Sequence, residues 1–151
     1  MALDIASPRS WLTSHAQALG VFGQVLAHEP VSAPGSGLTF AVWLGDIGPA
    51  QGSSGLNSTS ARVTFNGRVY LPADTEPMDD VDLVIGGAAA SVIGAYSGDF
   101  TLGGTVRNVD LLGEGDALRA RLGYLQLGST TYRIATITIP TIINDVWTQA
   151  A

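Results

Sequence analysis

Cysteine and lysine are both absent from this 151-residue chain. Without cysteine, a disulfide scaffold, a thiolate nucleophile and a Cys-ligated metal site are all excluded. The seven basic residues are all arginines, and 13 acidic residues give a formal net charge of -6. Because binding to a phosphate backbone needs clustered basic residues, this balance argues against a nucleic-acid-binding protein.

Charged residues of either sign are also scarce. They make up 13% of the chain, whereas hydrophobic residues make up 46%; the usual charged share is about 25%. A surface so poor in charge is either rich in small polar residues or covered by partners, and we favour partners in part. Arginine without lysine fits a protein interface. A GC-rich genome produces the same preference for arginine. We favour this explanation over the interface, and the two are compatible.

Neither a secretion signal nor a membrane span is expected. The N-terminus lacks a basic region followed by an apolar one. The longest apolar run, Val81 to Tyr96, is interrupted by Asp82, glycines and Ser91, and is too short to cross a bilayer. We therefore expect a protein made in the cytoplasm and kept there, or kept in something assembled there, with no membrane partner.

The chain length predicts one domain over residues 1–151. A first helix is expected to begin with Ser7 as its cap and Pro8 at its first position, and Thr13 or Ser14 is an alternative start. It is expected to end at His28-Glu29-Pro30. Its apolar residues recur at helical spacing: Trp11, Leu12, His15, Leu19, Phe22 and Leu26.

A second helix is expected from the aspartates at 79, 80 and 82, whose charges complement the positive end of a helix dipole. Its apolar stripe runs from Val81 to Tyr96. The other side of this helix is small or apolar rather than charged: Leu83, Gly86, Gly87, Ala90, Ile93 and Gly94. A helix that is apolar all round is buried on more than one side. We expect its own sheet on one side and a second subunit on the other.

Five strands are expected from short apolar runs between turn residues. The segment around Asn66-Gly67 has two interpretations, a tight hairpin or one strand with a bulge at Gly67, and we favour the single strand. Pro140 is expected at a sheet edge or a strand end. The predicted ranges are 38–44, Ala61–Leu71, Thr105–Leu112, Leu118–Leu127 and Tyr132–Thr141.

The run Gly45–Ser60 has no periodic pattern, and it is expected to be a flexible loop that protrudes and orders against a partner. The resulting order is α-β-β-α-β-β-β. This order predicts a two-layer α+β domain, in which two helices pack on a mostly antiparallel sheet of about five strands.

Groups that could carry chemistry are few. His15 is expected to pack in the core or at an interface, and His28 to cap the end of the first helix. The three aspartates at 79–82 lack the glycine and distal glutamate of a calcium loop. No nucleophile, nucleotide-binding or metal motif occurs. We therefore expect no catalytic residues, no cofactor and no metal, and hence no enzyme.

The arginines of the last third are the more informative polar residues. Arg119 and Arg121 share one face of a predicted strand, and Arg107 and Arg133 lie on neighbouring strands. One interpretation is a solvated sheet face. The other is a set of Arg–carboxylate pairs across subunit contacts, which suit the planar guanidinium. With Leu83 and Ile93 of the second helix, these four arginines are the predicted subunit or tube interface.

Several segments, in this order and spacing, resemble the tail terminator proteins of long-tailed phages, of the actinobacteriophage type. They are LGVFGQVLAHEP (19–30), FAVWL (40–44), SARVTFNGRVYLP (60–72), PMDDVDL (77–83), LGGTVRNVDLLG (102–113), Gly123-Tyr124 and the run from Tyr132 to Trp147. The resemblance covers nearly the whole chain and is weakest over Gly45–Ser60.

The resemblance implies a virion protein at the tail–neck junction, assembled in the host cytoplasm. Six copies would form a ring that caps the tail tube, ends its polymerisation and presents a surface for head joining. The implied partners are the chain itself, the tail tube protein and a head–tail connector or neck protein, while DNA passes through the lumen without specific binding. A different tail component, such as the tube protein, is the alternative, and a small-molecule-binding domain is a distant third.

Overall fold

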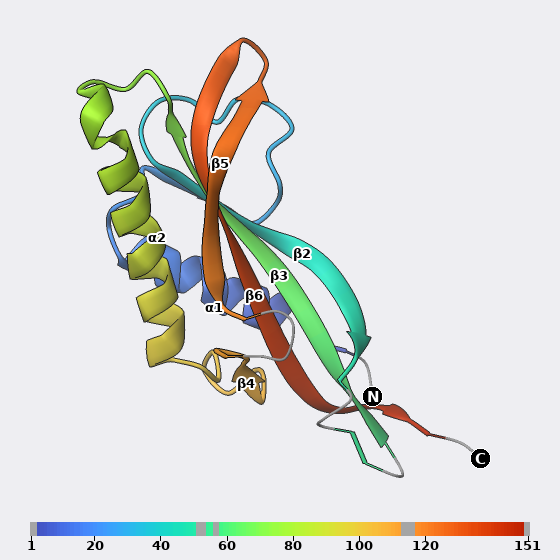
Figure 1. The fold of residues 1–151 in the computed structure, drawn as a ribbon. Helices are drawn as coiled ribbons and strands as arrows, with labels where there is room; N and C mark the ends of the chain where they lie inside the picture. The colour runs from blue at the N-terminus through green and yellow to red at the C-terminus, as the bar shows by residue number, and fades with distance from the viewer. Residues whose placement is uncertain (1–2, 51–53, 56–57, 113–116, 150–151) are drawn as a thin grey trace.

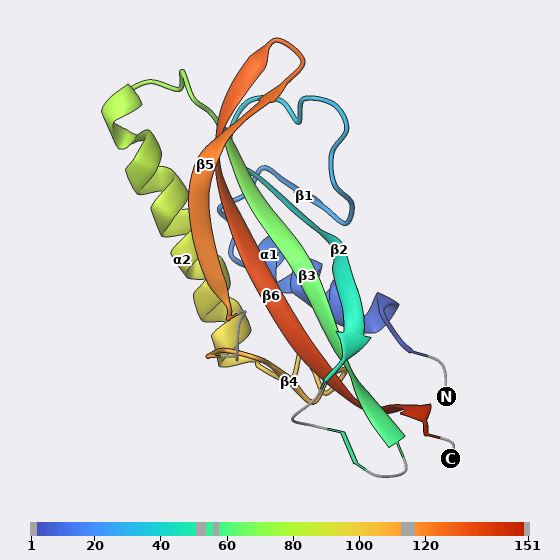
Figure 2. The ribbon, with the colours of Figure 1, turned by 45° about the vertical axis from the view of Figure 1, so that its right-hand side comes forward.

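The computed structural model describes residues 3–50, 54–55, 58–112 and 117–149. Two helices lie against one face of a long, twisted sheet (Figures 1 and 2). This is the two-layer α+β architecture expected from the sequence. The elements in chain order are α1 (Ala6–Ala18), β1 (Gln24–Leu26), β2 (Thr39–Pro49), β3 (Ser58–Pro72), the 3₁₀ turn η2 (Met78–Asp80), α2 (Val81–Gly98), β4 (Asn108–Val109), β5 (Arg119–Leu127) and β6 (Thr130–Thr148).

The sheet has six strands in the order β1-β2-β3-β6-β4, and β5 also pairs with β6. Every pairing is antiparallel except that of β1 with β2. One edge of β6 pairs with β3 over most of its length, while the other edge pairs first with β5 and then with β4. Strand β6 therefore holds the sheet together.

The main core lies between the helices and the sheet. Alternate residues of the central strands point toward the helices, as the two-residue period of a strand requires, and Phe65 and Ile137 are among the fully buried ones. Leu12 of α1, with Ile85 and Val92 of α2, packs into the same cluster. A smaller cluster around Tyr70 and Tyr132 lies elsewhere in the sheet.

The first helix is shorter than expected and starts one residue before Ser7, since Ala6 is its first helical residue. Ser7 does not cap it; instead, its amide donates a hydrogen bond of 3.1 Å to Asp4 Oδ1. The helix ends at Ala18, and Gly20 adopts a φ of +71°. The predicted apolar stripe extended beyond the helix because it included Phe22. Phe22 is apolar because its ring packs against that of Phe40, with the ring centres 5.4 Å apart.

The residues around Asn66-Gly67 form one strand, as favoured, but the predicted bulge at Gly67 is wrong. Gly67 pairs in register with Val42 and Ile137. The irregularity lies instead in β2, between Leu44 and Asp46. A Cβ atom on Gly67 would lie 2.8 Å from Phe40 Cζ, so glycine is present to admit the Phe40 ring.

The predicted loop Gly45–Ser60 is partly strand. Residues 45–49 complete β2 and residues 58–60 begin β3, so the two strands form a long hairpin. The start of β3 and the end of β6 extend beyond the helices (Figures 1 and 2). Residues 51–53 and 56–57, which lie between the strands, are outside the described residues, and the flexibility of this connection stays a prediction.

The predicted strand Thr105–Leu112 is reduced to Asn108–Val109. The preceding residues turn repeatedly, because Leu102, Gly103 and Gly104 all have positive φ angles. The amides of Thr105 and Val106 bond back to the carbonyls of Leu102 and Thr101 rather than to a strand. Residues 113–116, between this predicted strand and the next, lie outside the described residues.

Pro140 lies inside β6 rather than at an edge or a strand end. Its carbonyl accepts a hydrogen bond of 2.8 Å from the Asp110 amide. In a strand, the N and C=O of one residue face the same side, so the missing N–H of Pro140 faces the interval between β5 and β4. Pairing with β5 reaches Thr138, and pairing with β4 begins at Thr141. Proline is tolerated there because the interval has no full ladder.

Helix α2 begins at the predicted aspartates, with Asp80 at its N-cap position. Together with η2 it spans 21 residues and is long and apolar enough, by length and composition, to cross a membrane. From the sequence, this segment was expected to be too short to cross a bilayer, and the helix is longer than that expectation allowed. Its buried residues pack on the sheet as those of a core helix do: Val81, Ile85, Ala88, Ala89, Val92 and Tyr96.

Candidate interaction surfaces

Arg119 and Arg121 lie together on the sheet face that points away from the helices. Their Cα partners on β6 are Thr138 and Thr136. The intervening Ala120 packs against the main core, which places the two arginines on the opposite face. The four side chains line an open hollow of about 220 Å³. We call this surface, defined by Arg119, Arg121, Thr136 and Thr138, the open sheet face.

A third guanidinium lies beside this hollow. Arg68 of β3 donates a hydrogen bond of 3.2 Å from Nε to Thr136 Oγ1. Its guanidinium lies 5.2 Å from the centre of the Trp43 ring and within 3.7 Å of Glu29 Oε2. Arg68 is thus held by neighbours in its own chain. Burial raises the pKa of the adjacent Tyr70, and the Arg68 charge acts in the opposite direction.

Arg133 lies on the face of the sheet that the helices cover, not with Arg119 and Arg121. Its Nε donates a hydrogen bond of 2.8 Å to Asp82 Oδ1 at the start of α2. Its Nη1 donates to the carbonyl of Gly123 at 3.2 Å, and its guanidinium lies 4.5 Å from the centre of the Tyr124 ring. The bond to Asp82 raises the pKa of Arg133. This arginine therefore has its carboxylate partner within the chain.

Arg107 is separate from the other three predicted arginines. It lies just before β4, and its Nη1 donates a long hydrogen bond of 3.4 Å to Asn144 Oδ1. The structure thus brings together only two of the four arginines. A role for any of them in subunit contacts stays a prediction.

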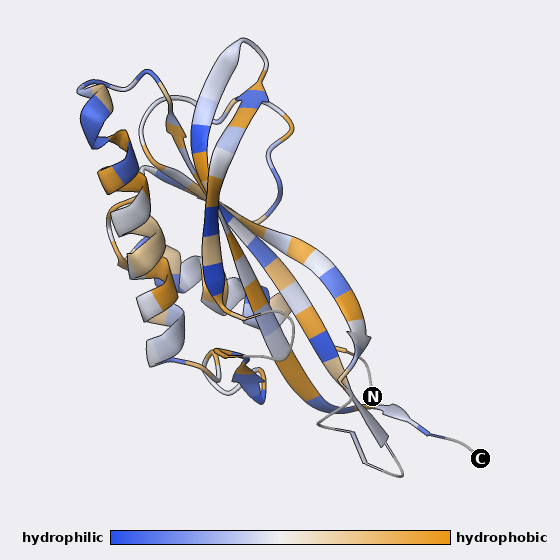
Figure 3. Ribbon diagram, in the orientation of Figure 1, coloured by the Kyte–Doolittle hydropathy of each residue, from blue (hydrophilic) through white to orange (hydrophobic). Residues whose placement is uncertain are grey.

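The outer side of α2 is the second candidate surface. Leu83 is 74% exposed and Val84 is 42% exposed. Ala90 and Gly94 are exposed on the same helix, whereas Ile93 is half-buried against the core. Figure 3 shows hydrophilic colour near the start of α2 and pale or hydrophobic colour along the rest. The single chain therefore leaves an uncharged helix surface in solvent.

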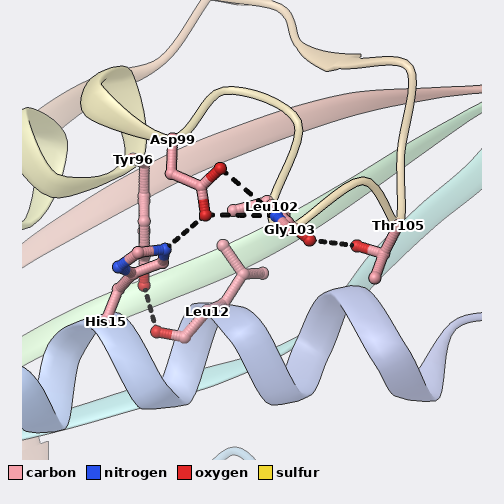
Figure 4. A network of polar contacts seen from close by, with 7 residues as sticks. All are labelled: Leu12, His15, Tyr96, Asp99, Leu102, Gly103 and Thr105. Carbon is pink, nitrogen blue, oxygen red and sulfur yellow. Dashed lines mark hydrogen bonds and ion pairs between the residues drawn. The ribbon is translucent and has the colours of Figure 1, made fainter.

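A polar network joins the two helices (Figure 4). His15 of α1 lies 2.8 Å from Asp99, measured from Nε2 to Oδ2. The Asp99 carboxylate also accepts hydrogen bonds from the Gly103 amide at 3.1 and 3.2 Å. These contacts, with His15 first, hold the pKa of Asp99 below its ordinary value. Beside them, the Tyr96 hydroxyl donates to the Leu12 carbonyl at 2.8 Å.

This network connects α1, α2 and the following turn, so the packing role expected for His15 agrees with its position. The expected capping role of His28 is wrong, because α1 ends ten residues earlier and His28 follows β1. Among the described residues, no group of three or more His, Asp or Glu side chains is placed to hold a metal ion.

Sequence reasoning missed three side chains at these surfaces. Thr136 and Thr138 were visible only as alternate polar positions in an apolar strand, and their pairing opposite Arg121 and Arg119 depends on the strand register. Asp82 was assigned to the helix dipole alone. Asp82 and its partner Arg133 are 51 residues apart in the sequence, and no local pattern predicts their contact.

No protein-family model matches this chain. No curated protein matches it either. Among solved structures, the chain is similar to the sheath/tube terminator of PVC, an extracellular contractile injection system, seen by cryo-EM in its extended state. The identity is 12% and the TM-score 0.40, with 100% of this chain and 60% of the other chain covered. The chain therefore spans about 60% of the length of that protein.

Proposed function

We propose that this protein is a structural subunit of a phage tail, which forms a ring on the end of the tail tube. The ring ends tube polymerisation and offers a surface to which the head or neck is joined. The order and spacing of the sequence segments that resemble tail terminators support the choice of this assembly. Ring size and the tube-facing residues are part of the proposal.

The observation that carries the proposal is the exposed, uncharged side of α2. From Leu83 to the end of the helix there is no charged residue, and Leu83 is 74% exposed in the single chain. Exposed apolar patches of this kind mark contacts with other proteins. A subunit that works inside an assembly requires such a surface.

Two further features support an assembly role. The start of β3 and the end of β6 project beyond the two-layer body, where they are accessible to a neighbouring molecule (Figures 1 and 2). The open sheet face presents guanidinium groups, and arginine is enriched at protein interfaces. The surface thus has a projection, an apolar helix and a basic sheet face.

The test is electron microscopy of a phage lysate made without this protein, with the wild-type gene supplied in trans as the control. We expect filled heads lying apart from tails of variable or excessive length. Normal joined virions would overturn the proposal. A complete absence of tubes would also overturn it, because it would assign the protein to the tube or to its initiation.

A small-molecule-binding domain makes the opposite prediction for the purified protein. It predicts a monomer or dimer with ligand-dependent melting. The hollow at the open sheet face is open and lined by two arginines and two threonines, rather than an enclosed apolar pocket of the kind that small ligands use. Screening for thermal shifts with anionic metabolites tests this alternative directly.

A further inference from the structure

Arg119 and Arg121 are a pair of cations with no carboxylate partner among the described residues. They lie two residues apart on one face of β5, which puts their Cα atoms about 7 Å from each other. Among the described residues, neither guanidinium makes an ion pair, whereas Arg62, Arg68 and Arg133 each do. Like charges at this spacing repel, so an approaching anion is favoured.

The densest run of carboxylates in the chain can supply this anion. The nine-residue run 74–82 connects β3 to α2 and contains five acidic residues and no basic one. All five are exposed: Asp74, Glu76, Asp79, Asp80 and Asp82. Within the described residues only Asp82 is in an ion pair, and its partner is an arginine. We call this run the acidic segment.

The acidic segment cannot reach the open sheet face of its own chain. Asp82 pairs with Arg133, whose guanidinium lies over the Tyr124 ring on the helix-covered face. Arg119 and Arg121 lie on the opposite face. The start of β5 lies near the C-terminal end of α2 (Figures 1 and 2). Because α2 has 18 residues, its two ends are about 27 Å apart. The two charged regions therefore meet only between molecules.

We propose that the acidic segment of one copy docks on the open sheet face of the next copy, with its carboxylates paired to Arg119 and Arg121. The two surfaces differ, so the contact is heterologous, and repeated copies form a ring or an open chain. This inference rests on the proposed ring function and names the charged contact that would join its subunits.

The electrostatics of the open sheet face favour a protein carboxylate over nucleic acid. Glu29, which follows β1, pairs with Arg68, and Asp110, which follows β4, pairs with Arg62. The chain as a whole carries a charge of -6, which repels a polyphosphate at long range. The planar guanidinium pairs with carboxylates in bidentate geometry, and the acidic segment offers several of them.

Charge reversal tests the contact. The variants Arg119→Glu/Arg121→Glu and Asp79→Arg/Asp80→Arg are each expected to weaken self-association on the order of a hundredfold, because each places like charges together. Combining all four changes is expected to restore association. The matched control is Arg9→Glu, which reverses one charge on the exposed side of α1, away from both surfaces. Sedimentation equilibrium at low ionic strength measures the association, and circular dichroism checks the fold.

The absence of cysteine permits a second test. In Asp80→Cys/Arg121→Cys, a short bismaleimide is expected to link successive copies into a ladder of dimers, trimers and higher species. Each single-cysteine variant is expected to stop at dimers. A double variant that also stops at dimers would overturn the heterologous contact. So would wild-type protein that shows no self-association in sedimentation equilibrium, or combined charge reversal without rescue.

The lysate experiment separates this inference from the function on which it rests. If Arg119→Glu/Arg121→Glu loses tail capping while self-association is unchanged, the open sheet face binds a different protein, and only the inference fails. If a lysate without the protein yields normal virions, the function fails, whatever the association measurements give.

Discussion

At the scale of single residues, two glycines in the sheet differ in the space that is left for a side chain. Gly67 lies beneath the Phe40 ring in the centre of the sheet, whereas Gly48 lies near the hairpin end with nothing within 4 Å of its missing Cβ. Both are in long strands, so their backbones cost similar entropy. The difference between them is therefore packing alone.

We expect Gly67→Ala to lower the free energy of unfolding by about 1–3 kcal/mol, because the Phe40 ring must move aside. Gly48→Ala is the matched control, and its effect is expected to stay within about 0.5 kcal/mol of zero. Urea unfolding followed by circular dichroism measures both. Equal losses for the two variants would contradict the close contact at Gly67.

Asp99 gives a residue-scale prediction in pH. Its pKa is depressed in the folded protein by His15 and the Gly103 amide. A depressed carboxyl pKa stabilises the fold above the unfolded value of 3.8, and this contribution is lost as the pH falls through the lower folded value. Wild-type stability is therefore expected to decline as the pH falls through 3.8 and below.

The variant Asp99→Asn is expected to be less stable than wild type at neutral pH and to lose less stability on acidification. Thermal melting between pH 6 and pH 3 measures the difference. Asp74→Asn serves as the control, since Asp74 is exposed and makes no hydrogen bond among the described residues. An unchanged pH slope in Asp99→Asn would show that the His15–Asp99 contact does not affect folding.

At the scale of elements, one buried hydroxyl contributes to the docking of α1 on α2. Tyr96 is fully buried, burial raises its pKa, and its hydroxyl donates to a carbonyl of α1. Removing the hydroxyl removes one hydrogen bond and keeps the ring. Tyr96→Phe is therefore expected to cost about 1 kcal/mol.

Tyr124→Phe is the control for that substitution, because Tyr124 is 67% exposed. Its free energy of unfolding is expected to match that of wild type. Urea titration of the two variants in parallel compares them. If Tyr96→Phe were as stable as wild type, the hydroxyl would not hold the helices together.

Element order and class were predictable where a local pattern dominates. The aspartates before Val81 fix the start of α2, and alternating apolar residues gave β5 and β6. Strand β1 was missed, and the residues from Gln24 to Leu26 were placed in a helix, because three residues pairing in parallel with β2 carry no pattern of their own. Tertiary contacts such as that of Phe22 with Phe40 overrode the helical spacing.

The candidate surfaces were predictable only in part. The two-residue period placed Arg119 and Arg121 on one face, as observed. It did not place Arg133 on the opposite face, because that assignment depends on the register between β5 and β6, which the turn after Leu127 sets. Whether Leu83 is solvent-exposed depended on which side of α2 meets the sheet, and an apolar helix leaves that undecided.

At the scale of the whole molecule, the uncharged side of α2 predicts a separation between folding and assembly. Leu83→Arg is expected to leave the melting temperature within about 2 °C of wild type, since an exposed substitution changes stability little. It is expected to abolish capping in the lysate complementation assay, because a charge replaces an apolar contact.

Two comparisons make that result specific. Gln17→Arg adds the same charge to the exposed side of α1 and is expected to complement normally. Ile85→Arg places the charge on the buried side of α2, in the main core, and is expected to prevent folding. Normal complementation by Leu83→Arg would remove α2 from the assembly surface.

Strand β6 has a consequence for how the protein is made. It pairs with β3, β4 and β5, yet it is synthesised after all of them. During translation, the earlier strands wait with open edges until residues 130–148 leave the ribosome. Pairing across such sequence separations is slow. The nascent chain therefore depends on late closure, and chaperone demand during synthesis is expected to be high relative to its size.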